Sequence, residues 1–238
     1  MIIGLAQYKF INRNIEFNLS QIKKAMEKYS TKADLLCFGE SFLQGFDALS
    51  GNYDDDKDIA VSINSQIIDT ICNWSKELNI SVMFGYFEKD NDIIYSSCVV
   101  ISEGKIIHNY RRISIGWRYL SWDNNHYKEG NSISTFKLNN HEFEIALCGD
   151  LRDTDWKKFK TDAVVLWPVY INFDLDSWVA EEKEYAIQAS KVAKKVLMIN
   201  SISESPNPIS HGGTFYFKEG DIISKLPYDD ETVLLIEI

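Results

Sequence analysis

The sequence predicts an α/β fold in which mixed β-sheets are covered by helices, and two observations lead to this prediction. Several short segments are apolar throughout, as expected for strands buried on both faces, and they alternate with amphipathic helices. Other segments read as hairpins with no helix between their strands, so antiparallel pairs must occur as well. Two such sheets packed face to face and one large mixed sheet would both satisfy this pattern.

The N-terminal half is expected to alternate between strands and helices. A strand at residues 2–8 precedes a helix capped by Asn18, and Ser62 is expected to cap a second helix. The acidic run 54–58 between these helices is interpreted as a solvated loop. The other strands of this half are expected at residues 33–38, 80–87, 94–101 and 105–110. The last two form a hairpin, because the turn sequence Glu103–Gly104 separates them.

The C-terminal half continues with strands around one long helix. The helix is expected at about residues 178–194, from its amphipathic pattern. The strands are expected at residues 143–148, 163–167, 196–200, 213–217, 221–225 and 232–238. No repeat, low-complexity segment or linker interrupts this series, so residues 1–238 are predicted to form a single domain.

The composition narrows the classes of partner. With 35 acidic and 25 basic side chains the formal net charge is -10, which opposes binding to nucleic acid or to anionic membranes. The N-terminus lacks the pattern of a secretory signal, and no apolar stretch approaches the thickness of a bilayer. We therefore expect a soluble, cytoplasmic protein that binds neither nucleic acid nor membrane.

Four cysteines are scattered along the chain without a C-x-x-C pair or a nearby histidine. Neither a zinc site nor a disulfide framework is indicated, and no metal or cofactor is expected. Cys37, Cys72 and Cys98 fall on apolar faces and are interpreted as core residues. Cys148 differs, because Gly149 and Asp150 follow it directly.

Three expected strand ends carry side chains that could do chemistry. Glu40, the pair Arg111 and Arg112, and Cys148 each lie where a strand opens into a loop, where α/β proteins place functional residues. The ordinary interpretations are a loop acid, surface arginines and a core cysteine. If the three groups meet, burial would fit Glu40 to take up a proton near neutral pH. An arginine beside Cys148 would then favour its thiolate and stabilise an oxyanion.

These strand ends resemble the motifs of the nitrilase superfamily of carbon-nitrogen hydrolases. The glutamate segment is similar to residues 33–46 (ADLLCFGESFLQGF), with Gly39 where the family has proline. The nucleophile segment is similar to residues 145–152 (IALCGDLR), and the lysine segment to residues 110–114 (YRRIS), with Arg112 in the place of the family's lysine. Weaker similarities occur in the expected order at residues 162–168, 196–201 and 211–213.

The resemblance implies a four-layer αββα sandwich with two mixed β-sheets and a constellation of Cys148, Glu40 and Arg112. Cys148 would be the nucleophile, Glu40 the general base and Arg112 the cation, in hydrolysis of an amide or carbamoyl carbon-nitrogen bond through a thioester. The implied partners are a small amide-type substrate and a second copy of the chain in a homodimer. A weakened or inactive binding subunit and an acyltransferase remain as alternatives, because an arginine cannot hand over a proton as lysine does.

Two further features are expected near the site. The N–H of Gly149 would be a second oxyanion donor, and its missing side chain would leave room beside the thiol. The family's second acid aligns loosely with Asp123, which is interpreted as a loop acid. Four aromatic side chains are candidates to line a pocket: Trp117, Tyr119, Trp122 and Trp156.

Overall fold

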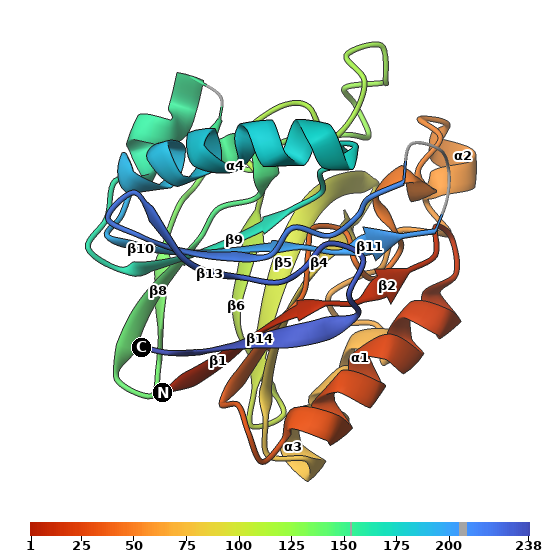
Figure 1. Cartoon of the computed structure of the whole chain (residues 1–238). Coiled ribbons are helices and arrows are strands. Elements are labelled where there is room, and N and C mark those ends of the chain that lie inside the picture. Colours follow the sequence, from red (N-terminus) through yellow and green to blue (C-terminus); the bar gives the residue numbers. More distant parts are fainter. Residues whose placement is uncertain (153, 205–208) are drawn as a thin grey trace.

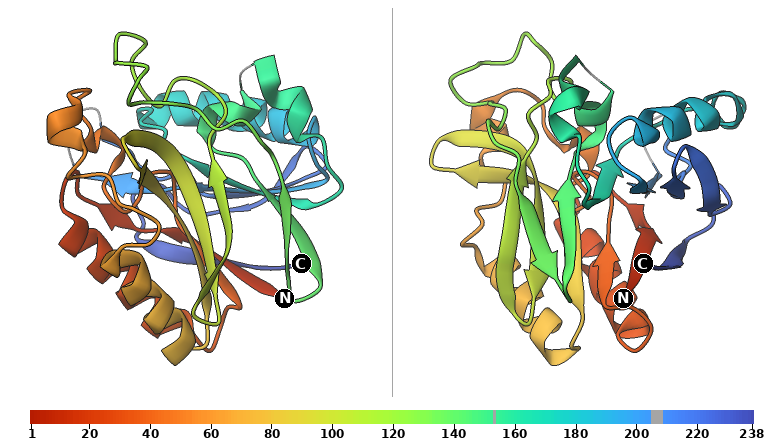
Figure 2. Two further views of the ribbon diagram at one scale, coloured as in Figure 1. Left: turned by 180° about the vertical axis from the view of Figure 1, so that it is seen from behind. Right: turned by 90° about the vertical axis from the view of Figure 1, so that its left-hand side faces the viewer.

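Two six-stranded mixed sheets pack face to face with helices outside them, which confirms the predicted αββα sandwich (Figures 1 and 2). The computed structural model describes residues 1–152, 154–204 and 209–238. In order, the first sheet contains β14 (Thr232–Glu237), β1 (Ile2–Gln7), β3 (Leu35–Cys37), β4 (Ser81–Asp90), β5 (Ile93–Ser102) and β6 (Lys105–Arg111). The second contains β13 (Asp221–Lys225), β12 (Phe215–Lys218), β10 (Lys195–Asn200), β9 (Val164–Val169), β8 (His141–Ile145) and β7 (Thr135–Leu138).

The remaining elements cover or connect the sheets. A two-stranded pair joins β2 (Lys9–Phe10) to β11 (Ile202–Ser203). The α-helices are α1 (Ile15–Tyr29), α2 (Tyr53–Asp56), α3 (Gln66–Glu77) and α4 (Leu175–Ser190). Short 3-10 helices span Phe46–Ala48, Cys148–Leu151 and Thr154–Phe159. No helix in the described part of the chain is long and apolar enough to cross a membrane.

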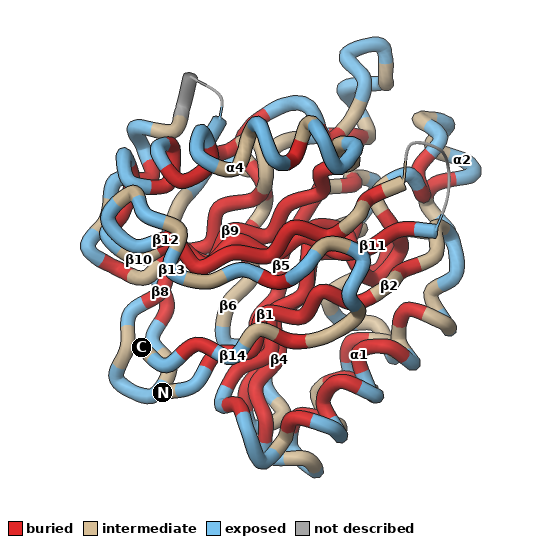
Figure 3. Tube along the Cα trace, in the orientation of Figure 1, coloured by how far each residue is buried: buried red, intermediate tan, exposed pale blue. Residues whose placement is uncertain are grey.

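Burial is concentrated between the layers, as the red strands and the pale outer faces of the helices in Figure 3 show. One core lies between the sheets, where Leu5 and Met83 of the first sheet and Val165 and Met198 of the second share one cluster of buried side chains. A second core lies beneath α1 and α3 (Figure 1). The apolar strand segments are therefore covered on both faces, as their composition predicts.

Two predicted helix starts are wrong. Helix α1 begins after Asn14, whose side chain accepts the N–H of Phe17, whereas Asn18 is buried and donates to the carbonyl oxygens of Ile11 and Leu43. Helix α3 is capped by Ser65 and not by Ser62. In both cases two residues that favour the N-cap position lie close together in the sequence, and packing decides at which of them the helix begins.

The chain ends lie side by side on β1 and β14. These strands pair in antiparallel register from Ile2 opposite Glu237 onward, and the N–H of Ile238 donates to the carbonyl oxygen of Met1 at 3.0 Å (Figure 1). The first and last strands of the sequence are thus neighbours in the first sheet.

Candidate active site

Cys148 lies on a tight turn at the end of β8. The strand ends at Ile145, and Cys148 opens the 3-10 helix Cys148–Leu151 with a positive φ of 37°, which side-chain-bearing residues rarely adopt. The turn is held because Asp150 accepts the N–H of Leu147 at 2.8 Å. This places the thiol just beyond the C-terminal end of β8, with its Sγ 3.8 Å from the carbonyl oxygen of Tyr170.

Glu40 lies three residues beyond the end of β3 and is almost completely buried. Its Oε1 accepts hydrogen bonds from Nη1 of Arg112 at 2.8 Å and from the hydroxyl of Ser96 at 3.1 Å. Its Oε2 has no hydrogen-bond partner among the described residues. One carboxylate oxygen is therefore held in place while the other keeps its acceptor capacity for a proton.

Arg112 directly follows β6 and is fixed through all three of its nitrogen atoms. Besides Glu40, Nε donates to the hydroxyl of Ser114 at 2.8 Å and Nη2 to the carbonyl oxygen of Ile115 at 3.0 Å. A guanidinium carries five N–H bonds, so these contacts leave one on each terminal nitrogen. Burial alone would lower the pKa of Arg112, but the negative charges of Glu40 and Asp150 help to raise it, and the group stays cationic.

Arg112 lowers the pKa of Cys148, as expected of a neighbouring cation, but burial and the charge of Glu40 outweigh this effect. Burial, followed by the charge of Glu40, raises the pKa of Cys148 to about 12 against the opposing effect of Arg112. Arg112 is already paired with Glu40, so its charge is largely compensated before it acts on the sulfur. The resting site therefore holds a thiol beside a carboxylate and a guanidinium.

Asp150 joins the nucleophile turn to the strand that carries Arg112. Its carboxylate accepts the hydroxyl of Tyr110 at 2.6 Å and the N–H of Ser114 at 2.8 Å, in addition to the N–H of Leu147. Burial raises the pKa of Asp150, against the lowering effect of Arg112 and of these donors. Through this carboxylate the positions of Cys148 and Arg112 depend on each other.

The glycine that replaces the family's proline has a structural reason. A Cβ on Gly39 would lie 2.6 Å from the hydroxyl oxygen of Ser201 and 3.3 Å from the carbonyl oxygen of Val169. The residues at 39 and 201 therefore fit each other as a pair. The close approach keeps the N–H of Glu40 within 3.3 Å of the Val169 carbonyl, which links the two sheets at the site.

The other predicted site features have different outcomes. The N–H of Gly149 belongs to the first turn of a 3-10 helix, where amides lack a partner within the helix, and its role as an oxyanion donor stays a prediction. Asp123 is an exposed loop acid near His126, as predicted. Trp117, Tyr119 and Trp122 line a common cavity. Trp156 is not among its lining residues and instead contacts lysines such as Lys160 and Lys191.

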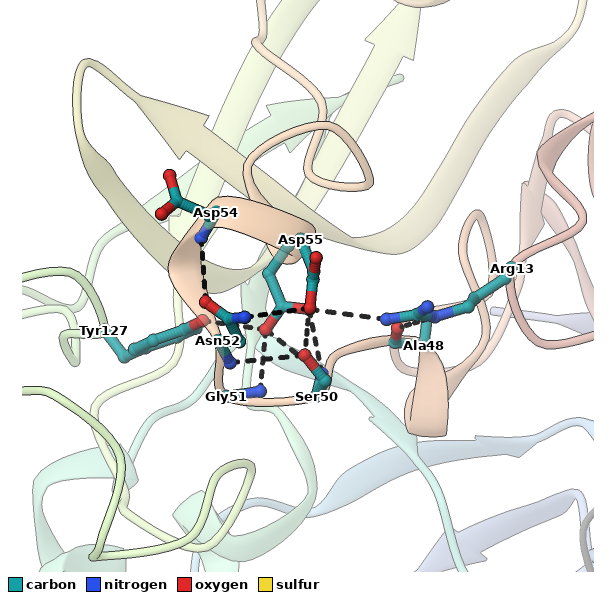
Figure 4. A network of polar contacts seen from close by, with 9 residues as sticks. Arg13, Ala48, Ser50, Gly51, Asn52, Asp54, Asp55 and Tyr127 are labelled. Carbon is teal, nitrogen blue, oxygen red and sulfur yellow. Dashed lines mark hydrogen bonds and ion pairs between the residues drawn. The ribbon is translucent and has the colours of Figure 1, made fainter.

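The interpretation of residues 54–58 as a solvated loop is wrong for Asp56. This carboxylate is fully buried and accepts the N–H groups of Ser50 and Gly51 at 2.8 Å and the hydroxyl of Tyr127 at 2.7 Å. Arg13, the adjacent residues Ser50 and Gly51, and Tyr127 come from three separate segments and converge here (Figure 4). The loop that follows Glu40 is thereby fastened to the segment that follows Arg112.

Sequence patterns gave no signal for several of these supporting residues. Ser96 approaches the site from β5 and Tyr170 from the loop after β9. The sequence of these segments predicts a strand and a loop but indicates no functional residue. Asp56 stands among other acids that are exposed. Among the described residues, no group of three or more His, Cys, Asp or Glu side chains could hold a metal ion.

Residues 2–161, more than half of the chain, match the family described as carbon-nitrogen hydrolase. Glutamine-dependent NAD(+) synthetases of Thermotoga maritima and Aquifex aeolicus are 24% and 21% identical over 153 and 156 residues. The match covers 63% of this chain but only 25% and 26% of the two synthetases, so the chain spans about a quarter of the length of these relatives.

Solved structures resemble the whole sandwich. A CN-hydrolase superfamily protein of Xanthomonas campestris, solved with an arsenic adduct in its active site, has a TM-score of 0.82 at 14% identity and covers 99% of this chain and 89% of that one. An amidase mutant of Nesterenkonia has a TM-score of 0.79 at 12% identity, covering 100% and 90%. The glutamine-dependent NAD+ synthetase of Acinetobacter baumannii has a TM-score of 0.81 at 17% identity, covering 98% and 44%. At these identities the likeness shows a shared fold.

Proposed function

Because the chain belongs to the carbon-nitrogen hydrolase family, we propose that it hydrolyses an amide or carbamoyl carbon-nitrogen bond through a thioester on Cys148. The observation that carries the proposal is the meeting of three groups that follow strands of both sheets, β3 and β6 of the first and β8 of the second. The thiol of Cys148 lies within the electrostatic influence of Glu40 and Arg112, and these two are joined by a 2.8 Å hydrogen bond. No cofactor is part of the proposal.

In the acylation step Glu40 takes the proton of Cys148 as the sulfur attacks the carbonyl carbon. The raised pKa of the thiol requires that proton transfer accompany the attack, so a base in contact with the thiol is needed. The oxyanion accepts hydrogen bonds from Arg112 and from the N–H of Gly149. When the tetrahedral intermediate collapses, the carbon-nitrogen bond breaks and the leaving amine takes the proton from Glu40.

In the deacylation step Glu40 takes a proton from water, and the hydroxide attacks the thioester carbon. The carbon-sulfur bond then breaks, the carboxylic acid leaves, and the sulfur regains its proton from Glu40. Arg112 supplies charge and hydrogen bonds in both steps but no proton, because its pKa is raised above the already high ordinary value. All proton transfers in this scheme therefore fall to Glu40.

The experiment that tests the proposal is ammonia release from a panel of amides, carbamoyl compounds and nitriles. At least one compound should release ammonia, and Cys148→Ala should abolish the release while the matched control Cys72→Ser keeps it. Mass spectrometry of the reacting protein should find the acyl group on the peptide containing Cys148. Release that persists in Cys148→Ala would refute the thioester mechanism.

A second candidate, a binding or partner subunit without turnover, is favoured by the raised pKa of Cys148 and by Arg112 in the lysine position. It predicts no product from any compound of the panel. Acyl transfer differs from both, because added hydroxylamine would be acylated at a rate that exceeds the hydrolysis rate. Product analysis with and without hydroxylamine separates these three outcomes.

We also propose that the protein forms a homodimer through the layer of α4. This helix leaves Val179 and Ile187 exposed on its outer side, at 68% and 47%. A contiguous exposed apolar patch marks an association surface, and the proposal places such a patch on the outer helical layer around these two side chains. Sedimentation equilibrium should give twice the mass of the 27.4 kDa chain, and Val179→Glu should shift the protein towards the monomer.

A further inference from the structure

A cavity of about 310 Å³ lies beside the candidate active site. One wall comes from the loop after Glu40 and includes Phe46 and Asp47, and the other comes from the segment after Arg112 and includes Arg118, Tyr119 and Trp122. The Asp56 contacts described above fasten these two walls to each other. Trp122 packs so closely on Gly51 that a Cβ there would lie within 2.5 Å of the indole ring.

Two contacts connect this cavity to the reacting groups. Tyr170 donates its hydroxyl to Oδ2 of Asp47 at 3.2 Å, while its own carbonyl oxygen lies 3.8 Å from Sγ of Cys148. On the other wall, a Cβ on Gly116 would lie 3.5 Å from Nη2 of Arg112. The length of the Tyr170 side chain therefore separates the cavity from the sulfur of Cys148. At its other wall the cavity approaches Arg112, the cation proposed to stabilise the oxyanion.

The charges of the cavity favour a cation. Asp47 and Arg118 are the charged side chains among its lining residues in the described part of the chain. Arg118 is already occupied, since it binds both carboxylate oxygens of Glu129 at 2.9 and 3.1 Å and Oδ1 of Asn124 at 2.9 Å. Among the residues that the structure describes, the carboxylate of Asp47 accepts one hydrogen bond, from the neutral hydroxyl of Tyr170. The uncompensated charge in the cavity is negative.

The aromatic walls act in the same direction. Phe46 stacks on Tyr170 with ring centroids 4.4 Å apart, and Tyr119 and Trp122 meet edge to face at 5.8 Å, so aromatic rings stand on both walls. Aromatic faces attract ammonium groups, and the formal net charge of -10 draws cations towards the protein. An anionic group would instead meet Asp47 and an arginine that is already neutralised.

We propose that this cavity binds a positively charged group of the substrate, with Asp47 as its counter-ion, so that the protein prefers amides carrying an ammonium group. The inference rests on the proposed amide hydrolysis and names the substrate class of that site. The ammonium group would lie between Asp47 and the aromatic walls while the amide carbonyl reaches Cys148. The counter-ion Asp47 would then lie at the hydroxyl end of Tyr170, and the reacting thiol of Cys148 at its backbone carbonyl.

The first experiment compares three primary amides of equal chain length that end in an amino, a methyl or a carboxylate group. The ω-amino amide should have the highest kcat/KM. The Asp47→Asn variant should lower its preference over the methyl analogue by about three- to tenfold, as for loss of a partly exposed ion pair. Asp58→Asn, which removes an exposed acid outside the cavity lining, is the matched control and should keep the preference.

The second experiment does not depend on turnover and so separates this inference from the proposed function. Isothermal titration calorimetry of the intact protein should find that an alkylammonium ion binds more tightly than the alcohol or carboxylate of the same length, and that Asp47→Asn weakens this binding. Absence of hydrolysis together with such binding would refute the reaction and support the cavity. A preference for the methyl or carboxylate compound, or a cation preference unchanged in Asp47→Asn, would overturn the inference.

Discussion

Nη1 of Arg112 donates a 2.8 Å hydrogen bond to Oε1 of Glu40, and both side chains are at most 3% exposed. A buried ion pair of this kind is costly to break, because removing either partner leaves the other charge without compensation. The pair also explains why the lowering effect of Arg112 on the pKa of the Cys148 thiol is outweighed. The charge of Arg112 is shared with the base that has to remove the proton.

Replacement of Arg112 by alanine and by lysine should show whether its positive charge or its hydrogen-bond geometry is needed for turnover. Arg112→Ala should lose about 2 to 4 kcal/mol of transition-state stabilisation in kcat/KM, the size expected for an oxyanion donor. Arg112→Lys keeps the charge and should retain or exceed the parent turnover, although it loses the bonds to Ser114 and Ile115. Steady-state kinetics with thermal melts of each variant checks this, and an active, folded Arg112→Ala would show that another cation does the work.

Removal of the charge of Glu40 should make the thiol more reactive and the protein less active. The negative charge of Glu40 raises the pKa of Cys148, so Glu40→Gln should lower it and speed alkylation by iodoacetamide at pH 8, about tenfold for each unit by which the pKa falls. Turnover should fall because the base is gone. Glu103→Gln, in the exposed turn between β5 and β6, is the control. Slower alkylation in Glu40→Gln would contradict this electrostatic account.

Glu144 should make the stability of the protein depend on pH. Burial raises the pKa of this carboxyl from 4.5 to about 7, and its Oε1 has no partner among the described residues. Its folded-state pKa lies above the unfolded value, so its stabilising effect is complete below pH 4.5 and is lost as the pH rises through 7. Glu144→Gln should therefore be more stable than the parent at pH 8 by about 1 to 3 kcal/mol and close to it at pH 4.5.

Urea denaturation at both pH values measures this difference. Glu142→Gln, at an exposed acid two residues earlier on the same face of β8, should leave the pH dependence of the parent unchanged. An equal gain at both pH values would show that Glu144→Gln acts through packing and not through ionisation.

Loss of the Asp56 carboxylate should weaken the whole loop system around the cavity. Asp56→Ala leaves two N–H groups and the hydroxyl of Tyr127 without their acceptor, which should cost about 2 to 4 kcal/mol in the free energy of unfolding. Asp55→Ala, at the exposed neighbour, should cost less than about 0.5 kcal/mol. Denaturant unfolding compares them, and similar values for the two variants would argue against the Asp56 contacts as the fastening of this loop.

Gly39 and Ser201 should behave as a coupled pair. Gly39→Ala places a methyl group against the Ser201 hydroxyl and should destabilise the protein by about 1 to 3 kcal/mol. Ser201→Ala removes that hydroxyl, so the double variant should recover part of the loss. A double-mutant cycle of unfolding free energies measures the coupling, and strictly additive values would show that the contact is relieved elsewhere.

Most of the fold could be predicted because its strands are buried on both faces, and apolar runs such as residues 163–167, which lie in and next to β9, indicate this in the sequence. The two-residue strands β2 and β11 could not, since two residues show no periodicity. Cys148, Glu40 and Arg112 stood out as reactive types at strand ends. The raised pKa of Cys148 and the burial of Asp56 depend on the residues that pack around them in the fold. The residues adjacent to them in the sequence do not specify these contacts.

The hydrogen bond between Ile238 and Met1 holds the backbones of these two residues side by side. A short linker joining these ends would close the backbone into a ring without disturbing the pairing of β1 with β14. The ring could then be reopened at the hairpin turn Asn139–Asn140, where both residues have positive φ. Such a circular permutant would keep every strand of both sheets and change only the order in which a ribosome makes them.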